Sequence, residues 1–289
     1  MAFAFHRDES FAHAIQRLAR HRLDAAIARL EETPRTDAAV HEARKSLKKA
    51  RALTRLADEG LRHARRFDRR LGAVARALGR SRDAAVLLEV HRELRHALGR
   101  VESDRLEQAL LREREEAEAG LVTASPSLLA ALRDLRTDIA DAPVRGGWSG
   151  GWRGIEAAYR RAAAAHRRAE RSRDAKDLHR WRRRAKDQWY HLRLLLGAWP
   201  AGLTPLAGEV EAVCEGLGTD HDLHVLGERV ASLEPDAKRQ RALARMIAAR
   251  RVAAHEPALR LGARLYAEEP AAYAARLRGY WRAWSGDEG

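Results

Sequence analysis

The sequence has almost no cysteine, since Cys214 is the only one in 289 residues. A single thiol excludes an intrachain disulfide framework and a cysteine-rich zinc or iron–sulfur site. Val213 and Leu217 flank it and predict that it packs inside a helix. Long apolar runs are also lacking, because Arg or Lys interrupts every candidate for the roughly 18 apolar residues of a spanning helix. The charged residues 6–9 replace the apolar run of a signal peptide, so we expect a cytoplasmic protein with no membrane span.

Nucleotide-binding and catalytic motifs are missing as well. The chain contains no GxGxxG, no GxxxxGK[ST], no HExxH and no CxxC. His221 and His224 lie one helical turn apart beside Asp220 and Asp222, a pattern that fits either a partial metal site or, more commonly, a polar helix start capped by Thr219. We therefore expect no catalytic residues, no metal and no cofactor, and a protein that is not an enzyme.

What the sequence has in excess is positive charge. Lys and Arg number 55 against 41 Asp and Glu, a formal net charge of +14. Such an excess predicts attraction to nucleic acid, acidic membranes or phosphate polymers, but says nothing about fold.

The hydrophobic pattern predicts an all-α fold. Ala, Leu, Arg and Glu dominate, and apolar residues recur at intervals of three or four residues, as at Phe11, Ile15 and Leu18. Helix breaks are expected at Thr33-Pro34 with a cap at Thr36, Gly79, Ser125-Pro126, Pro143, Gly218 and Glu234-Pro235. The helices between these breaks would have roughly 14–25 residues, as in antiparallel bundles with short loops.

The two halves of the chain resemble each other. Residues 41–48 align with residues 179–186 at an offset of 138, and Leu78-Gly79 with Leu217-Gly218 at an offset of 139. Between the halves, the glycine-rich stretch 141–154 suits a hinge or connector. We therefore predict one domain made of a helical repeat over 1–142, a connector over 143–154 and a second repeat over 155–289, the two bundles being related by a pseudo-two-fold axis.

Each half contains a helix with one basic face. On a helical wheel, His41, Arg44, Lys45, Lys48, Arg51 and Arg55 form a first basic strip, to which the neighbouring Lys49 is added, and His179, Arg182, Arg183, Lys186, Tyr190 and Arg193 form a second basic strip. Such a face is usually only solvated. Here, however, Glu42 is the sole acid between His41 and Arg55, and the cost of uncompensated charge is incurred in both halves. We expect the strips to line a common basic groove.

A linear polymer of phosphates fits such strips. Arg holds two phosphate oxygens with its planar fork, Lys acts as a mobile charge, and successive turns are about 5.4 Å apart. A neighbouring polyanion would favour protonation of His41 and His179; alternatively, each is simply a polar residue near a helix start.

The pattern His-x-x-Arg-(x)-x-x-Lys in each half, followed by Leu-Gly-x-x-Arg/His-Asp, resembles the CHAD family, the conserved histidine α-helical domain. The resemblance spans roughly residues 5–284. It implies two helical bundles about a pseudo-two-fold axis, with a basic groove that binds inorganic polyphosphate. By position, the implied contacts are His41, Arg44, Lys48, Lys49, Arg51, Arg55, His179, Arg182, Lys186, Tyr190 and Arg193.

Two positions depart from the family pattern. Trp189 stands where the second repeat usually has a further Arg, so Arg183 or Arg193 would carry more of the contact. His221 stands where the first repeat has Arg82, which we also assign to the binding site, so the second position would be weaker or sensitive to pH.

The sequence thus predicts polyphosphate as the partner and association with polyphosphate granules. A nucleic acid is the alternative partner, but base stacking needs exposed aromatic residues, and aromatics are only 6% of the chain. An enzyme acting on phosphate polymers would need acids that hold Mg²⁺. The acids nearest the strips, Glu42, Asp83, Asp187 and Asp222, are too scattered in sequence to suggest such a site.

Overall fold

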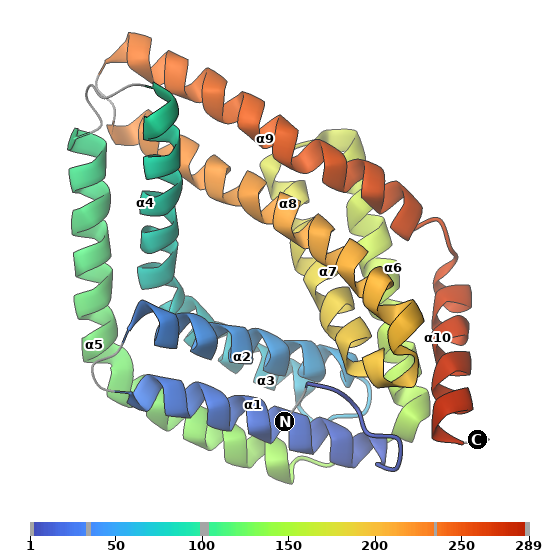
Figure 1. The fold of residues 1–289 in the computed structure, drawn as a ribbon. Helices are drawn as coiled ribbons and strands as arrows, with labels where there is room; N and C mark the ends of the chain where they lie inside the picture. Colours follow the sequence, from blue (N-terminus) through green and yellow to red (C-terminus); the bar gives the residue numbers. More distant parts are fainter. Residues whose placement is uncertain (1–2, 33–35, 99–103, 234–235, 287–289) are drawn as a thin grey trace.

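The computed structural model describes residues 3–32, 36–98, 104–233 and 236–286, and these residues confirm the all-α fold (Figure 1). The helices are α1 (Phe11–Glu31), α2 (Asp37–Leu56), α3 (Ala64–Ala77), α4 (Gly79–Leu98), α5 (Asp104–Asp141), α6 (Gly147–Ser172), α7 (Ala175–Leu195), a 3-10 turn η1 (Leu196–Ala198), α8 (Pro200–Leu233), α9 (Ala237–Leu265) and α10 (Pro270–Ser285). None of the helices in these ranges combines the length and apolar character needed to cross a membrane.

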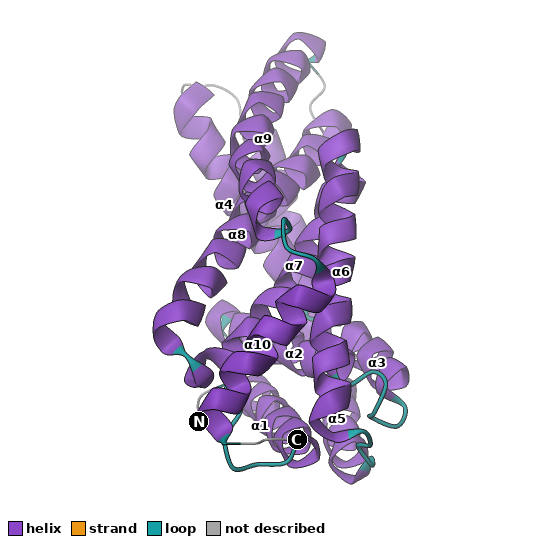
Figure 2. Cartoon of the chain, turned by 90° about the vertical axis from the view of Figure 1, so that its right-hand side faces the viewer, coloured by secondary structure: helices purple, strands orange, loops and turns teal. Residues whose placement is uncertain are grey.

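The helices follow one another around four sides of the ribbon in Figure 1. Helices α1 and α2 form one side with the last part of α5, and α6 and α7 form the next. Helices α8 and α9 form the third side, and α4 with the first part of α5 returns to α2. Helix α10 packs against α6 on the outside, as the side view shows (Figure 2). Helices α2, α7, α8 and α4 are therefore each in contact with the next.

Helices α2 and α7 carry the two basic strips, and both begin after a capping side chain, of which that of Thr36 is the predicted one. The hydroxyl of Thr36 accepts a hydrogen bond of 3.1 Å from the Ala39 N–H, and the Asp174 carboxylate accepts one of 2.7 Å from the Asp177 N–H. The residues opposite the strips are buried as expected: Val40, Ala43, Leu47, Ala50 and Leu53 on α2, and Leu178, Trp181, Ala185, Leu192 and Leu195 on α7. Burial of these faces turns the two strips away from the core.

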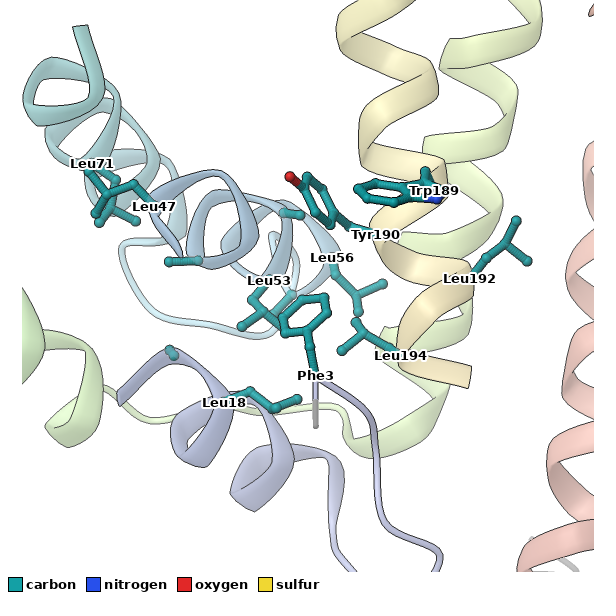
Figure 3. Close-up of a cluster of buried hydrophobic side chains, with 14 of the residues drawn as sticks. Phe3, Leu18, Leu47, Leu53, Leu56, Leu71, Trp189, Tyr190, Leu192 and Leu194 are labelled. Atoms are coloured by element: carbon teal, nitrogen blue, oxygen red, sulfur yellow. The ribbon is translucent and has the colours of Figure 1, made fainter. Parts of the chain in front are cut away.

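The main hydrophobic core runs through both halves of the chain, and the N-terminal segment lies in it. Phe3 packs among Leu53, Leu56 and Leu194, so it fills the junction between α2 and α7 (Figure 3). The Phe5 N–H donates a hydrogen bond of 2.9 Å to the Leu194 carbonyl. This segment therefore packs against both helices that carry the strips.

A second, smaller core closes the opposite corner. Leu87 and Leu88 of α4 and Leu110 of α5 are buried with Leu223 and Leu226 of α8. The two halves therefore meet twice, once at α2 and α7 and once through these leucines.

The predicted connector over 143–154 is wrong from Gly147 onward, because α6 begins there. A Cβ on Gly151 would lie 2.6 Å from the Phe11 ring, and one on Gly154 would overlap the Leu56 carbonyl. The glycines are needed because α6 packs closely on α1 and α2, so their lack of a side chain serves helix packing rather than a hinge.

Two of the predicted helix breaks are also wrong. Pro126 lies inside α5, and Gly218 lies inside α8, so these helices reach 38 and 34 residues. A proline inside a helix removes one N–H and bends the helix, and α5 accordingly runs along α4 and then along α1 (Figure 1). The breaks at Gly79 and Pro143 are confirmed. Those at Thr33-Pro34 and Glu234-Pro235 lie outside the described residues.

Candidate functional site

The two basic strips come together around Lys48. The surrounding protein, followed by the positive charges of Arg44, Arg182 and Lys186, lowers the pKa of the Lys48 amine to about 8, although this side chain still reaches solvent. Two of these cations belong to α7, so Lys48 of the first strip lies within electrostatic range of the second. The two helices together concentrate positive charge in one place, which favours the binding of a polyanion.

Arg44 is held where α3 ends and α4 begins. Its guanidinium donates to the Ala75 carbonyl at 3.1 Å and to the Asp83 carboxylate at 3.3 Å. A Cβ on Gly79 would overlap this guanidinium, so the glycine makes room for it. Arg44 is only 15% exposed, and its position is fixed before any ligand arrives.

Arg182 likewise lies against a glycine, which belongs to α8. A Cβ on Gly218 would lie 3.2 Å from Nη2 of Arg182, which places the guanidinium directly against the glycine backbone. The repeated His-x-x-Arg and Leu-Gly blocks are therefore linked: in each half, the arginine of the His-x-x-Arg block packs on the glycine of the Leu-Gly block. This contact explains the paired blocks in physical terms.

At the other end of the strips, Lys49 and Arg193 lie near each other. The pKa of Lys49 is lowered to about 8 by burial and then by the charges of Arg22 and Arg193, and its amine lies 5.5 Å from the centre of the Phe3 ring. Arg22 of α1 is a buried arginine that the sequence analysis missed. The only signal was its place between Ala19 and Leu23 on an apolar helix face.

Trp189 supports two cations of the second strip. The Lys186 amine lies 4.1 Å and the Arg193 guanidinium 4.8 Å from the centre of its ring system. These residues are three positions before and four positions after Trp189, the spacing of neighbours on a helix face. The tryptophan in place of the usual arginine thus orients the two cations by cation–π contacts.

The assignment of Tyr190 to the binding surface requires correction. Its side chain is 5% exposed, and its ring meets Phe3 edge-on with 6.1 Å between ring centres. Figure 3 shows the ring inside the apolar cluster with its hydroxyl pointing away from the leucines. The helical wheel places Tyr190 on the basic face, but the N-terminal segment covers that part of α7.

Several cations of the first strip are neutralised, which corrects the expectation of uncompensated charge. Asp68 of α3 pairs with Arg51 at 2.8 Å and with Arg55 at 3.0 Å, and Arg55 also pairs with Asp187 of α7. The carboxylates are far from these arginines in sequence. Within α2 itself, Lys45 pairs with Glu42 at 2.9 Å. The Asp68 and Asp187 pairs therefore join α2 to α3 and α7.

His179 lies against His221 of α8, with 4.3 Å between ring centres. Burial, and then the neighbouring His221, Arg182 and Arg183, lowers the pKa of His179 to about 4. Without a ligand it is therefore neutral at pH 7, and a bound polyanion would raise this pKa.

The remaining predicted residues are placed as follows. Arg183 is exposed beside Arg55 and Arg184. His41 is half-buried and is the fifth residue of α2. The side chain of Arg82 lies outside the described residues.

No group of three or more His, Cys, Asp or Glu side chains in the described ranges could hold a metal ion. Cys214 is buried as predicted, and burial raises its thiol pKa to about 12.

The sequence profile of the CHAD domain matches residues 17–231. The chain belongs to the CHAD family. No curated protein gives a significant sequence match. Among solved structures, the chain is similar to PptA from Streptomyces chartreusis, with a TM-score of 0.70 and 14% identity over 90% of this chain and 100% of that one. It is also similar to the CHAD domain from the plant Ricinus communis, with a TM-score of 0.57 and 19% identity over 98% and 95% of the two chains. At these identities the similarity establishes the fold alone.

Proposed function

We propose that this CHAD protein binds inorganic polyphosphate without hydrolysing it, using the cations of both strips on one chain of phosphates. The observation that carries the proposal is the electrostatic coupling of Lys48 to Arg182 and Lys186. Like charges held close together destabilise the unliganded protein, and a polyanion placed between them removes that cost. Cytoplasmic localisation and association with polyphosphate granules follow as further proposals.

Preorganisation supports the same function. Arg44 and Arg182 lie against glycines, and Lys186 and Arg193 lie on the Trp189 ring system. Side chains that are already positioned lose less conformational entropy when they bind.

Binding of labelled long-chain polyphosphate tests the proposal. We expect Lys48→Gln combined with Lys186→Gln to weaken binding by at least about tenfold, because each charged contact with phosphate is worth roughly 1.5–3 kcal/mol. Lys238→Gln combined with Arg264→Gln is the matched control, since both residues are exposed on α9 and the variant loses the same net charge. Equal affinities of the two variants would refute the assignment.

Competition separates polyphosphate from the alternative partner. We expect single-stranded DNA or RNA, at equal phosphate concentration, to displace little polyphosphate, because the aromatic residue beside the cations, Trp189, is 8% exposed and offers little face for a base. Efficient displacement by either nucleic acid would favour nucleic-acid binding instead. Release of orthophosphate in the presence of Mg²⁺ would contradict the proposed absence of hydrolysis.

A further inference from the structure

A pocket lined mainly by arginines lies beside the ion pair of Arg55 with Asp68. Its volume is about 300 Å³, near the lower limit for pockets that bind small molecules. Helices α2, α3, α6 and α7 all contribute to it. Its charged lining residues are Arg55, Arg65, Arg69, Arg161, Arg184, Asp58 and Asp68. We call it the arginine pocket.

The carboxylates of the arginine pocket are already engaged. Asp68 pairs with Arg55, and Asp58 lies 3.3 Å from Arg65. Five guanidinium groups against two carboxylates leave an excess of three positive charges in the lining. An excess of this kind in a concave site attracts anions.

Arg161 and Arg184 carry most of that excess. Nε of Arg161 is buried and has no hydrogen-bond acceptor among the described residues. Nη1 of Arg184 lies 3.9 Å from Asp187, beyond hydrogen-bond distance. Burial and the neighbouring Arg161 and Arg55 lower the pKa of Arg184, although Asp187 acts in the opposite direction. Arg161 thus has one buried nitrogen that lacks an acceptor, and the contact of Arg184 with Asp187 is too long for a hydrogen bond.

We infer that the arginine pocket is a second anion site, which binds compact oligophosphates through Arg161 and Arg184. The planar forks of arginine match phosphate oxygens in bidentate geometry. The ligand is either free inorganic pyrophosphate or the end of a phosphate chain. The second source rests on the proposed function, because Arg183 lies near Arg55 and Arg184 and so links the second strip to the pocket. The first source stands without it.

Calorimetric titration of the full chain with inorganic pyrophosphate at low salt tests the site. We expect Arg161→Gln combined with Arg184→Gln to weaken pyrophosphate binding by at least about tenfold. The control Arg245→Gln combined with Arg264→Gln on α9 should bind as the wild type does. Absence of pyrophosphate binding by the wild type, or equal losses in both variants, overturns the inference.

Thermal unfolding shows whether the double variant is folded. If it is not, Arg69→Gln decides, because Arg69 is exposed in the lining and pairs with no carboxylate of the described residues. We expect this variant to bind pyrophosphate about threefold more weakly, and unchanged affinity overturns the site.

The strip variant Lys48→Gln with Lys186→Gln separates this inference from the proposed function. It should lose long-chain binding and keep pyrophosphate binding. The reverse pattern, with pyrophosphate lost here but retained by the Arg161/Arg184 variant, overturns the pocket while leaving polyphosphate binding intact.

Displacement of pyrophosphate by polyphosphate identifies the ligand source. Two kinds of chain are compared, with free ends and with capped ends. If only the free-ended chains displace pyrophosphate, the pocket binds chain ends, and if neither kind does, it binds free pyrophosphate. If chains with both ends capped as phosphoramidates displace pyrophosphate as well as free-ended chains, the pocket takes chain interiors and the inference of a compact ligand fails.

Discussion

The basic strips on α2 and α7 occupy equivalent positions in the sequence but differ in how their charges are held. On α2, Arg51 and Arg55 are paired with carboxylates from other helices. On α7, no carboxylate of the described residues lies within ion-pair distance of Arg182, Arg183, Lys186 or Arg193. Arg182 lies against a glycine backbone, and Lys186 and Arg193 lie on an aromatic ring system. An ion pair must be loosened before its cation meets a phosphate, whereas a cation on an aromatic face keeps its charge available. We therefore expect α7 to contribute more of the affinity.

The largest effect should come from replacing matched pairs of cations on the two helices by glutamine. Arg182→Gln with Lys186→Gln on α7 is expected to weaken polyphosphate binding about 100-fold, against about tenfold for Arg44→Gln with Lys48→Gln on α2. Arg44 shares its charge with Asp83, so less is lost when it is removed. Fluorescence anisotropy with labelled polyphosphate measures both. A larger loss from the α2 variant would reverse the comparison.

Rising pH should weaken binding through the first strip. Because the pKa values of Lys48 and Lys49 are lowered to about 8 without ligand, both lose protons between pH 7 and 9, and a polyanion must restore them. We expect a loss of roughly three- to tenfold in affinity over this interval. Titration in buffers of different ionisation enthalpy should reveal proton uptake.

The same lysines make the unliganded fold more stable as pH rises from about 8 to 10.5, since there the unfolded chain binds more protons. Lys48→Arg should flatten the pH dependence of binding. A binding constant that does not change from pH 7 to 9 would contradict the lowered pKa values.

Removing the carboxylate that neutralises the first strip should strengthen binding. Asp68→Asn releases Arg51 for phosphate and leaves Arg55 paired with Asp187 alone, and we expect about a threefold gain in affinity at some cost in stability. Asp138→Asn is the matched control. Asp138 of α5 pairs with Arg70, which lies on α3 like Asp68 but belongs to neither strip. Weaker binding by the Asp68 variant would show that the pairs organise the site rather than compete for it.

The smallest difference concerns the two glycines. A methyl group at position 79 would displace the Arg44 guanidinium, whereas one at position 218 would make a tight contact with Arg182. We expect Gly79→Ala to lower polyphosphate affinity about twofold to threefold and Gly218→Ala to change it less. The same titration measures both, and the opposite order would mean that Arg44 does not contribute through its fixed position.

The sequence was sufficient to predict the helices that carry the site. Thr36 caps α2 as expected, and the periodic apolar residues fix which face of α2 and α7 is buried. Local chemistry and helical periodicity determine these features, and both can be read over a few turns of sequence.

The ionic partners could not be predicted. Asp68 reaches Arg51 from the next helix, and Asp187 reaches Arg55 from the other half of the chain. Counting acids between His41 and Arg55 finds neither, because tertiary packing rather than sequence spacing brings these charges together. Tyr190 was misassigned for the same reason, since a helical wheel cannot show that Phe3 covers it.

Glycine and proline were misread where packing overrides local preference. Gly151 and Gly154 lie within α6, where neighbouring helices leave no room for a side chain. Pro126 lies within a bent α5. A helix-breaking residue within a packed helix is tolerated when tertiary contacts offset its cost.

The most direct test of the central claim is a crystal structure of the full chain with long-chain polyphosphate. The account predicts a chain of phosphates that contacts Lys48 on α2 and Arg182 and Lys186 on α7 at the same time. Phosphates bound to only one of these helices, or on the outer surface of α9, would contradict a shared site.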